Sequence, residues 1–273
     1  MPVRNGARYL KQALESVLGQ TFNDFEFLII NDGSTDETEE IAKGYANKDD
    51  RVKVINNEKN LGLQKTLNKG VELSQGEYIA RIDCDDIWLD KKKLQKQVSA
   101  LDSNSDIGVI GTGFVSIDEN EKELFRVKFP SNDEKIRNNI LTCNQLAHPS
   151  VVIRKKALDE LGKYSEKKKY QHIEDYELWL RIGKKYKFAN LDEYCLGYRI
   201  DSNGISLNNQ FKVRFRGLLL SVENRKAYPH GIKAIFIKIL SFFIFRSALD
   251  FMMKKSKPLR KLSKQMTSIS VSK

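Results

Sequence analysis

Phe25-Glu-Phe-Leu-Ile-Ile30 and the adjoining Asn31-Asp-Gly-Ser-Thr-Asp36 decide the fold of this 273-residue chain. The first six residues form a continuous, mainly apolar run, which is typical of a buried strand. The next six supply turn residues, and Ser34 and Glu37 are spaced as a capping box that would open a helix. A buried strand that passes through a polar turn into a helix is the repeating unit of α/β proteins.

The same alternation continues along the chain. A helical pattern precedes this stretch, with Asn5 as the expected N-cap. Further strands or extended runs are expected at 52–55, 78–82, 107–117, 148–153 and 188–198, and further helices at 61–73, 91–101, 133–142 and 174–186. Strands separated by helices of this length predict an α/β fold with a mostly parallel sheet flanked by helices.

Composition and charge divide the chain into a neutral body and a basic tail. Apolar residues make up 40% and charged residues 30%, as in soluble folded proteins. Three scattered cysteines and a start without a signal-peptide pattern predict a cytoplasmic setting without disulfides or a cysteine-based zinc site. Residues 225–273 hold twelve Lys or Arg and one acid, which accounts for the whole net charge of +11. We therefore expect a domain at 1–208, a helical, apolar and basic segment at 209–262 and a disordered tail at 263–273.

The first acidic cluster is residues 31–36, which lie where the expected strand ends. In α/β sheets this is where ligand sites are found. Two interpretations stay open at this point. Either Asp32 accepts hydrogen bonds from a nucleotide base or ribose, or the cluster is only a strand-to-helix turn built from residues with turn chemistry.

The second cluster follows the strand expected at 78–82 and contains Asp83, Asp85 and Asp86. Three carboxylates within four residues repel one another unless a cation or hydrogen-bond donors compensate them. Hard oxygen ligands at this density suit Mg²⁺ or Mn²⁺, which would bridge to a diphosphate. A solvated acidic loop is the alternative, but the position at a strand end favours the metal site.

The third cluster, Glu174-Asp175-Tyr176-Glu177, opens an expected helix. Acids in a first helical turn are favoured by the helix dipole, so a purely structural role is one interpretation. In the other interpretation, Asp175 is partly desolvated beside Tyr176 and Trp179, as suits a general base.

The order and spacing of these clusters resemble family 2 glycosyltransferases with the GT-A fold. The resemblance covers roughly residues 1–205 of 273. It is carried by Pro2-Val3-Arg4-Asn5, Asn31-Asp32-Gly33-Ser34-Thr35-Asp36, Asn60-Leu61-Gly62, Asp83-Cys84-Asp85-Asp86 and Glu174-Asp175-Tyr176. Each motif alone is weak evidence, whereas five motifs in this order are strong evidence.

The resemblance implies a nucleotide-sugar donor bound by the first half of the chain. Pro2 and Asp32 would lie at the nucleotide base, with Asn60 and Lys65 nearby. Members of the family usually begin with a hydrophobic strand before the motif at Pro2. We therefore expect that the recorded start is internal or that the product is truncated, and that a form extended upstream would be more stable.

The resemblance also implies where the reaction occurs. Asp83 would hold the ribose or the metal, and Asp85 would bind the divalent ion, Mn²⁺ or Mg²⁺. Glu174 would contribute to substrate binding, and Asp175 would remove the proton from the acceptor hydroxyl. A single base on one face implies inversion at the anomeric carbon. Asp201 stands where the family commonly has a His, which leaves a phosphate contact from that loop in doubt.

These parts predict an inverting, metal-dependent glycosyltransferase, with a UDP-sugar as the expected donor. The expected acceptor is a hydroxyl of a saccharide or of a lipid-linked acceptor in cell-surface polysaccharide synthesis. Two alternatives stay open. One is transfer to polyprenyl phosphate, where no base is needed, and the other is an inactive scaffold that binds nucleotide sugar.

The tail is apolar as well as basic. Between residues 232 and 253, large apolar residues are interrupted by three basic residues and Asp250, which is too much charge for a membrane-spanning helix. Helices that pack on the body are one interpretation. The other, favoured by six basic residues between 254 and 264, is peripheral contact with anionic membrane on its cytoplasmic face. The body is neutral and the last twenty residues hold no aromatic side chain, so no nucleic-acid partner is expected.

Overall fold

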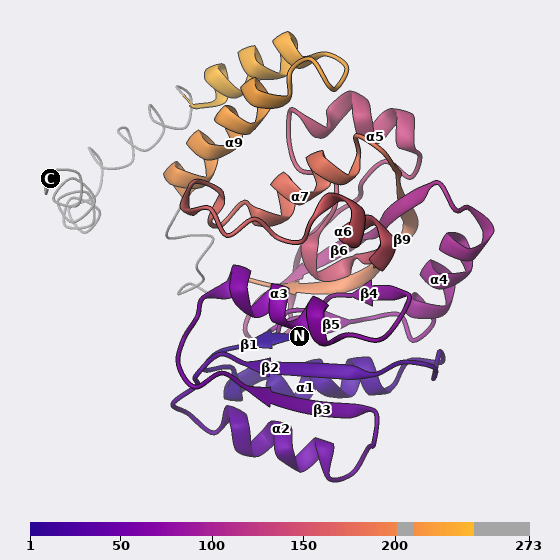
Figure 1. Ribbon diagram of the computed structural model, residues 1–273, viewed down its shortest axis with the longest axis vertical. Coiled ribbons are helices and arrows are strands. Elements are labelled where there is room, and N and C mark those ends of the chain that lie inside the picture. Colours follow the sequence, from indigo (N-terminus) through magenta and orange to yellow (C-terminus); the bar gives the residue numbers. More distant parts are fainter. Residues whose placement is uncertain (201–209, 243–273) are drawn as a thin grey trace, which may run out of the picture.

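The chain forms two β-sheets with helices packed on them (Figure 1). The computed structural model describes residues 1–200 and 210–242. The first half contains β1 Pro2–Val3, α1 Ala7–Leu18, β2 Phe27–Asn31, α2 Thr38–Ala46, β3 Val52–Asn56, α3 Leu63–Leu73, β4 Tyr78–Ala80, β5 Ile87–Trp88 and α4 Lys93–Ser103. The second half contains β6 Ile107–Ile117, β7 Glu123–Val127, α5 Asp133–Ile140, η1 His148–Ser150, β8 Val152–Arg154, α6 Lys155–Leu161, η2 Lys168–Tyr170, α7 Glu174–Ile182, β9 Lys187–Arg199 and α9 Gln210–Asn224. The expected α/β class is confirmed.

The first sheet is parallel and has the order β1-β2-β3. Pro2 of β1 lies opposite Ile30 of β2, and Asn31 at the end of β2 lies opposite Asn56 at the end of β3. The carboxyl ends of the three strands therefore meet at one edge. Asp32 follows β2 directly and lies at this edge.

The second sheet is mixed, with the order β4-β8-β6-β9-β5 and with β7 paired to β6. Among its described strands only β6 and β9 run parallel, and the other pairs are antiparallel. The expected mostly parallel pairing therefore holds for the first sheet and for β6 with β9 alone. β6 and β7 are joined by residues 118–122, which are too few for a helical crossover, so these two strands form a hairpin.

Two helices begin differently from the expectation. α1 has Gly6 as its N-cap, whereas the Asn5 side chain accepts a hydrogen bond from the Thr35 amide at 2.8 Å. α2 has Glu37 as its N-cap, and the Ser34 hydroxyl accepts from the Asn5 amide at 3.0 Å. The predicted N-cap at Asn5 and the predicted capping box were wrong because these side chains bridge two loops instead of capping their own helices.

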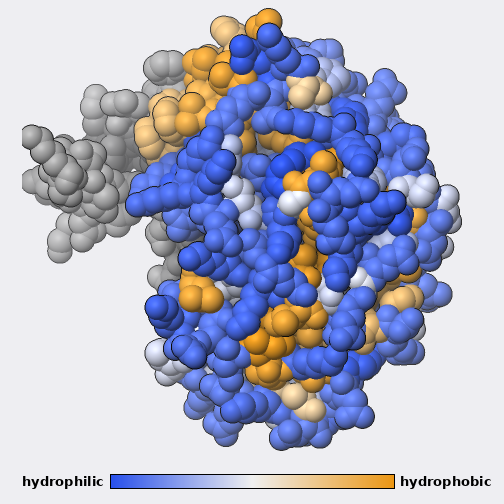
Figure 2. Space-filling model, in the orientation of Figure 1, coloured by the Kyte–Doolittle hydropathy of each residue, from blue (hydrophilic) through white to orange (hydrophobic). Residues whose placement is uncertain are grey.

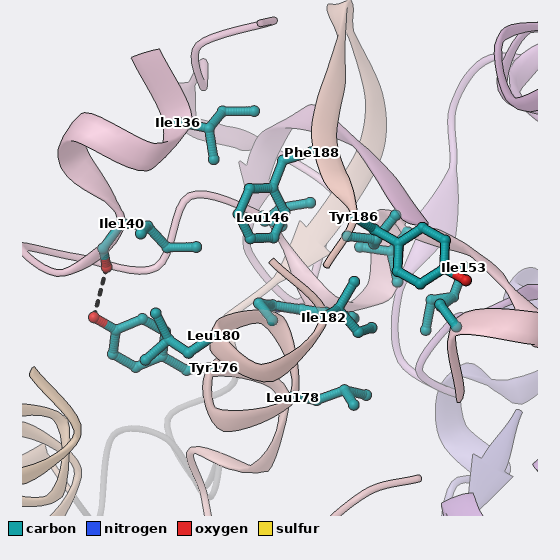
Figure 3. Packing of buried hydrophobic residues seen from close by; sticks show 14 of the residues in the cluster. Ile136, Ile140, Leu146, Ile153, Tyr176, Leu178, Leu180, Ile182, Tyr186 and Phe188 are labelled. Carbon is teal, nitrogen blue, oxygen red and sulfur yellow. Dashed lines mark hydrogen bonds between the residues drawn. The ribbon is translucent and has the colours of Figure 1, made fainter. Parts of the chain in front are cut away.

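A large apolar cluster fixes the position of α7. Trp179 of this helix is completely buried in the cluster. Figure 3 shows Tyr176 reaching across to α5, where its hydroxyl donates to the carbonyl oxygen of Ile140 at 2.5 Å. Because Glu174 and Asp175 form the first turn of the same helix, this packing decides where the third acidic cluster lies.

The C-terminal helices pack on the same cluster. α9 is followed by a second helix at residues 231–242, and Leu220, Tyr228 and Ala234 are buried with the side chains of α7. No helix among the described residues is long and apolar enough to cross a bilayer. The expected domain boundaries at 208 and 262, the expected tail at 263–273 and Asp201 lie outside the described residues.

A buried cation lies in α4. Lys93 is completely buried, and its ammonium donates to the Gln97 side-chain oxygen at 2.8 Å and lies 3.9 Å from the centre of the Trp88 ring. In the part of the chain that the structure describes, Lys93 makes no ion pair. Burial therefore lowers the pKa of Lys93 to about 7.

Replacing Lys93 by Met should change how stability depends on pH. The unfolded side chain keeps its proton up to about pH 10, whereas the folded one, with its pKa of about 7, has released it over most of that range. Unfolding then takes up a proton, so the wild type gains stability as the pH rises from about 7 to about 10. The Lys93→Met variant lacks this dependence. We therefore compare the free energy of unfolding of the variant minus that of wild type. This difference should be larger at pH 7 than at pH 10, by on the order of 3 kcal/mol.

Urea titrations of both proteins at the two pH values measure this difference. The two proteins share every other titrating group, so the contributions of those groups largely cancel. A difference that does not change with pH would show that Lys93 is not a buried, proton-releasing cation.

Candidate active site

The Asp32 carboxylate holds the loop that follows β3. Its Oδ1 accepts hydrogen bonds from the Asn57 side chain and the Leu61 amide, both at 2.8 Å, and its Oδ2 accepts from the Gly62 amide at 3.0 Å. Burial alone would raise the pKa of Asp32, but these hydrogen bonds outweigh it and hold the pKa below its usual value. Asp32 is thus an ionised side chain that orders the rim of the first sheet, as well as a residue expected at the nucleotide.

Pro2, Asn60 and Lys65 lie around the same rim. Pro2 is buried in β1, and the Asn60 side chain accepts a hydrogen bond from the Gly62 amide at 2.9 Å. Asn60 also packs on the turn at Gly33, where a Cβ would lie 2.9 Å from its amide nitrogen. Lys65 is exposed in the first turn of α3. The structure therefore gathers these predicted donor-binding residues at one edge.

Gly6 connects this rim to the acidic turn of residues 83–86. Its amide donates to the Thr38 hydroxyl at 2.9 Å. A Cβ on Gly6 would lie 2.8 Å from a Val3 methyl group and 2.9 Å from the Cys84 sulfur, closer than real Cβ atoms approach. A glycine at this position lets the loop after β1 lie directly against the acidic turn.

The acidic turn brings three carboxylates together. One oxygen from each of Asp83, Asp85 and Asp86 lies within 4.8 Å of the others. Asp86 is 1% exposed, and its Oδ2 has no hydrogen-bond partner among residues 1–200 and 210–242. Burial and the charge of Asp83 raise the pKa of Asp85 to about 6. A buried, unpartnered carboxylate oxygen within such a cluster fits a hard divalent cation.

Arg199, the last residue of β9, holds this turn in shape. Its amide donates to Asp86 Oδ1 and its Nε to the Asp85 carbonyl oxygen, both at 2.9 Å. Its Nη2 also reaches the Gln12 side chain in α1 at 2.9 Å. Sequence reasoning assigned no role to Arg199, since only the fold brings the end of the last strand to a turn more than a hundred residues earlier.

Arg81 is a counter-charge shared by the acidic turn and the start of α7. Its guanidinium is buried and makes a two-pronged ion pair with both carboxylate oxygens of Asp83. Its positive charge also lowers the pKa values of Asp85, Glu174 and Asp175, against the effect of burial, which raises them. No function was expected for Arg81 from the sequence. A basic residue directly after a strand and two positions before a carboxylate was the available signal.

Glu174 and Asp175 present different environments at the start of α7. Glu174 is buried, and burial together with the charge of Asp175 raises its pKa to about 7. Asp175 is half-buried and accepts a hydrogen bond from the Asn144 side chain at 2.8 Å. Burial raises the pKa of Asp175 as well, which makes it a stronger base than an exposed aspartate. Asn144, which holds the Asp175 carboxylate, was not singled out from the sequence.

A second group of possible ligands consists of Asp90, in the segment between β5 and α4, and of Glu193 and Cys195 in β9. The Lys96 ammonium already pairs with both of its carboxylates. Because an internal cation neutralises this group, it fits a divalent ion less well than the acidic turn does.

Sequence comparisons identify the protein family in which these features occur. The sequence profile described as Glycosyl transferase family 2 matches residues 1–162. An uncharacterized glycosyltransferase of Methanocaldococcus jannaschii is 33% identical over 266 residues, which cover 91% of this chain and 90% of the relative. The O-antigen biosynthesis glycosyltransferase WbnJ of Escherichia coli is 35% identical, with 73% and 78% covered. The amylovoran biosynthesis glycosyltransferase AmsE of Erwinia amylovora is 33% identical, with 72% and 73% covered.

Two solved structures share the fold over most or all of the length of this chain. TarS of S. aureus, in complex with UDP-GlcNAc, superposes with a TM-score of 0.66 at 22% identity over 89% of this chain and 70% of that one. The mannosyltransferase PcManGT of Pyrobaculum calidifontis, in complex with GDP-Man and Mn²⁺, gives a TM-score of 0.67 at 14% identity over 100% and 79%. At these identities the likeness establishes the fold.

Binding of Mn²⁺ should depend on the acidic turn and not on the second group of acids. Asp85→Asn removes one carboxylate charge from the turn, so we expect at least a tenfold weaker affinity for Mn²⁺ by calorimetry. Glu193→Gln makes the same chemical change in the group that Lys96 neutralises and should bind Mn²⁺ as wild type does. Normal Mn²⁺ binding by Asp85→Asn together with lost binding by Glu193→Gln would show that the ion binds at Asp90, Glu193 and Cys195 and not at the acidic turn.

Proposed function

The chain belongs to glycosyl transferase family 2 and has the GT-A fold, and from that premise we propose the reaction that it carries out. It transfers a sugar from a nucleotide-diphosphate sugar to an acceptor hydroxyl, with inversion at the anomeric carbon and with a divalent cation. One observation carries this proposal. The acidic turn at Asp83 and Asp85 and the carboxylate of Asp175 come from distant parts of the chain but share the charge of Arg81.

The proposed donor is a UDP-sugar. Support comes from S. aureus TarS, which has this fold and has been solved with UDP and with UDP-GlcNAc. The nucleotide would lie at the rim formed by Pro2, Asp32 and Asn60, where the loop after β3 is held by hydrogen bonds. Lys65 adds an exposed positive charge beside an anionic ligand.

Asp83 and Asp85 would hold Mn²⁺ or Mg²⁺, next to the unpartnered Asp86 oxygen described above. When bound, such an ion supplies positive charge that stabilises the departing nucleotide diphosphate. The chain's own part is to keep the ligands in place. Arg199 fixes the backbone of the turn, and Arg81 orients Asp83 through both of its oxygens.

Asp175 would act as the general base. The acceptor oxygen forms a bond to the anomeric carbon while the bond from that carbon to the diphosphate oxygen breaks. The electron pair of the broken bond leaves with the nucleotide, and the hydroxyl proton passes to Asp175. Because one carboxylate serves one face of the sugar, the displacement occurs once and the configuration inverts. Asn144 orients the carboxylate, and Glu174 contributes to acceptor binding beside it.

The proposed acceptor is a saccharide or a lipid-linked saccharide in the synthesis of cell-surface polysaccharide. Support comes from AmsE and WbnJ, which are named for amylovoran and O-antigen biosynthesis. We place the reaction at the cytoplasmic face of the cell membrane, where such an acceptor would be anchored. Transfer to polyprenyl phosphate is the second candidate, favoured by the apolar and basic C-terminal segment.

The decisive experiment measures release of nucleotide diphosphate from a panel of UDP- and GDP-sugars with Mn²⁺ and a saccharide acceptor. Asp175→Asn should lower kcat by roughly a hundredfold to ten-thousandfold, which is the usual contribution of a general base. Donor affinity should stay unchanged, because Asp175 touches only the acceptor. Asp159→Asn, an exposed acid on α6, is the matched control and should keep full activity.

Other outcomes would separate the alternatives. Full activity in excess chelator would remove the metal from the reaction. Turnover by Asp175→Asn on polyprenyl phosphate, with none on saccharide, would favour the second candidate. Nucleotide-sugar binding without turnover on either acceptor class would favour the scaffold role.

A further inference from the structure

α9 and the helix at residues 231–242 form an antiparallel helical hairpin. The Phe211 and Phe242 rings at its open end lie 4.8 Å apart. Farther along, the Lys238 ammonium donates to the Gly217 carbonyl oxygen at 2.9 Å. The start of α9 therefore contacts the end of the second helix, and a second contact farther along fixes the antiparallel pairing.

One face of the hairpin is fixed to the body. The Ser221 hydroxyl donates to the Leu141 carbonyl oxygen at 2.7 Å, and the Tyr228 hydroxyl donates to the Leu180 carbonyl oxygen in α7 at 2.9 Å. Lys238 also reaches the Tyr176 hydroxyl at 3.2 Å. The hairpin is therefore a layer of the folded protein, and within residues 1–200 and 210–242 its other face is the one left open to a partner.

The outer face carries two apolar stripes. The stripes are made of the exposed side chains of Phe211, Phe215, Leu219 and Val222 on α9, and of Ile232, Phe236, Ile239 and Leu240 on the second helix, where Ile237 is exposed as well. Their spacing of three or four residues places each set on one side of its helix. The exposed fraction reaches 83% at Ile232 and 68% at Phe236. Figure 2 shows hydrophobic residues gathered on the surface over α9 and the helix that follows.

Positive charge accompanies these stripes. Of the fifteen large apolar residues that are exposed in the described chain, nine lie between 211 and 240. Lys212, Lys226 and Lys233 are exposed on the hairpin itself. The sequence from 225 onward, which includes Lys226 and Lys233, carries a net charge of +11, with six basic residues between 254 and 264. Apolar side chains for insertion and basic side chains for headgroups together match an anionic lipid surface.

We propose that the two apolar stripes of the hairpin are the surface through which the enzyme binds anionic membrane. The aromatic and aliphatic side chains enter the headgroup region, and Lys212, Lys226 and Lys233 lie over the anionic headgroups. The proposal deepens the membrane setting given above, on which it rests. Its test records vesicle binding and not sugar transfer, so the two proposals can fail separately.

The test is co-sedimentation of the full chain with vesicles of phosphatidylglycerol and phosphatidylcholine. Phe215→Glu with Phe236→Glu should weaken binding at least tenfold, because each stripe loses its central aromatic residue and gains a negative charge. Leu124→Glu with Phe125→Glu alters two apolar residues on β7 that are as exposed as Phe215, and it should leave binding unchanged. Binding to vesicles of pure phosphatidylcholine should be weak, and high salt should lower binding to the anionic vesicles.

A conservative variant guards against misfolding. Phe236→Trp keeps an aromatic side chain at this exposed position, and its fluorescence should shift to shorter wavelength and be quenched by brominated lipid when anionic vesicles are added. An unchanged spectrum in bound protein would overturn the proposal. Equal binding to neutral and anionic vesicles would also overturn it. The same holds if the wild type is a dimer and the double Glu variant is a monomer that still binds vesicles, because a second copy of the chain would then cover this face.

Discussion

The rest of the site depends on the positive charge of the buried Arg81 guanidinium, which forms an ion pair with Asp83. A group of carboxylates withdrawn from water repel one another and are costly to keep ionised. Arg81 offsets this cost for two acidic groups at once, because it pairs with Asp83 and also lowers the pKa values of Glu174 and Asp175. The strands around it, the turn that Arg199 ties down and the packing of α7 all serve to bring those acids within range of this single charge.

Sequence patterns predicted the fold where burial is continuous. The strand expected at 107–117 has those bounds, because it is apolar and buried along almost its whole length. β7 was missed since its residues are exposed, and two-residue β5 carries too little pattern to detect. The three acidic clusters could be recognised from composition and from their place after strands. Arg199 and Asn144 could not, because their value comes from partners that lie 31 or more residues away.

The rim of the first sheet illustrates how one side chain can serve both structure and ligand. The sequence left two interpretations of Asp32, a turn residue or a nucleotide contact. In the folded chain it orders the loop after β3 through three hydrogen bonds, so its role in the turn is a physical fact. The same hydrogen bonds keep its charge and hold Asn60 nearby, which is what a nucleotide site requires. The two interpretations are therefore compatible.

The hairpin and the helix that carries Asp175 share one apolar core, with Tyr228 bonded to Leu180 and Lys238 bonded to Tyr176. This shared core fixes the position of the Asp175 carboxylate relative to the hairpin. When the hairpin binds a surface, the distance between that surface and the Asp175 carboxylate is therefore fixed, and side-chain motion alone cannot change it. An acceptor chain anchored in that surface would be modified at a set distance from its anchor, so the geometry of the core would limit which sugar along the chain can be reached.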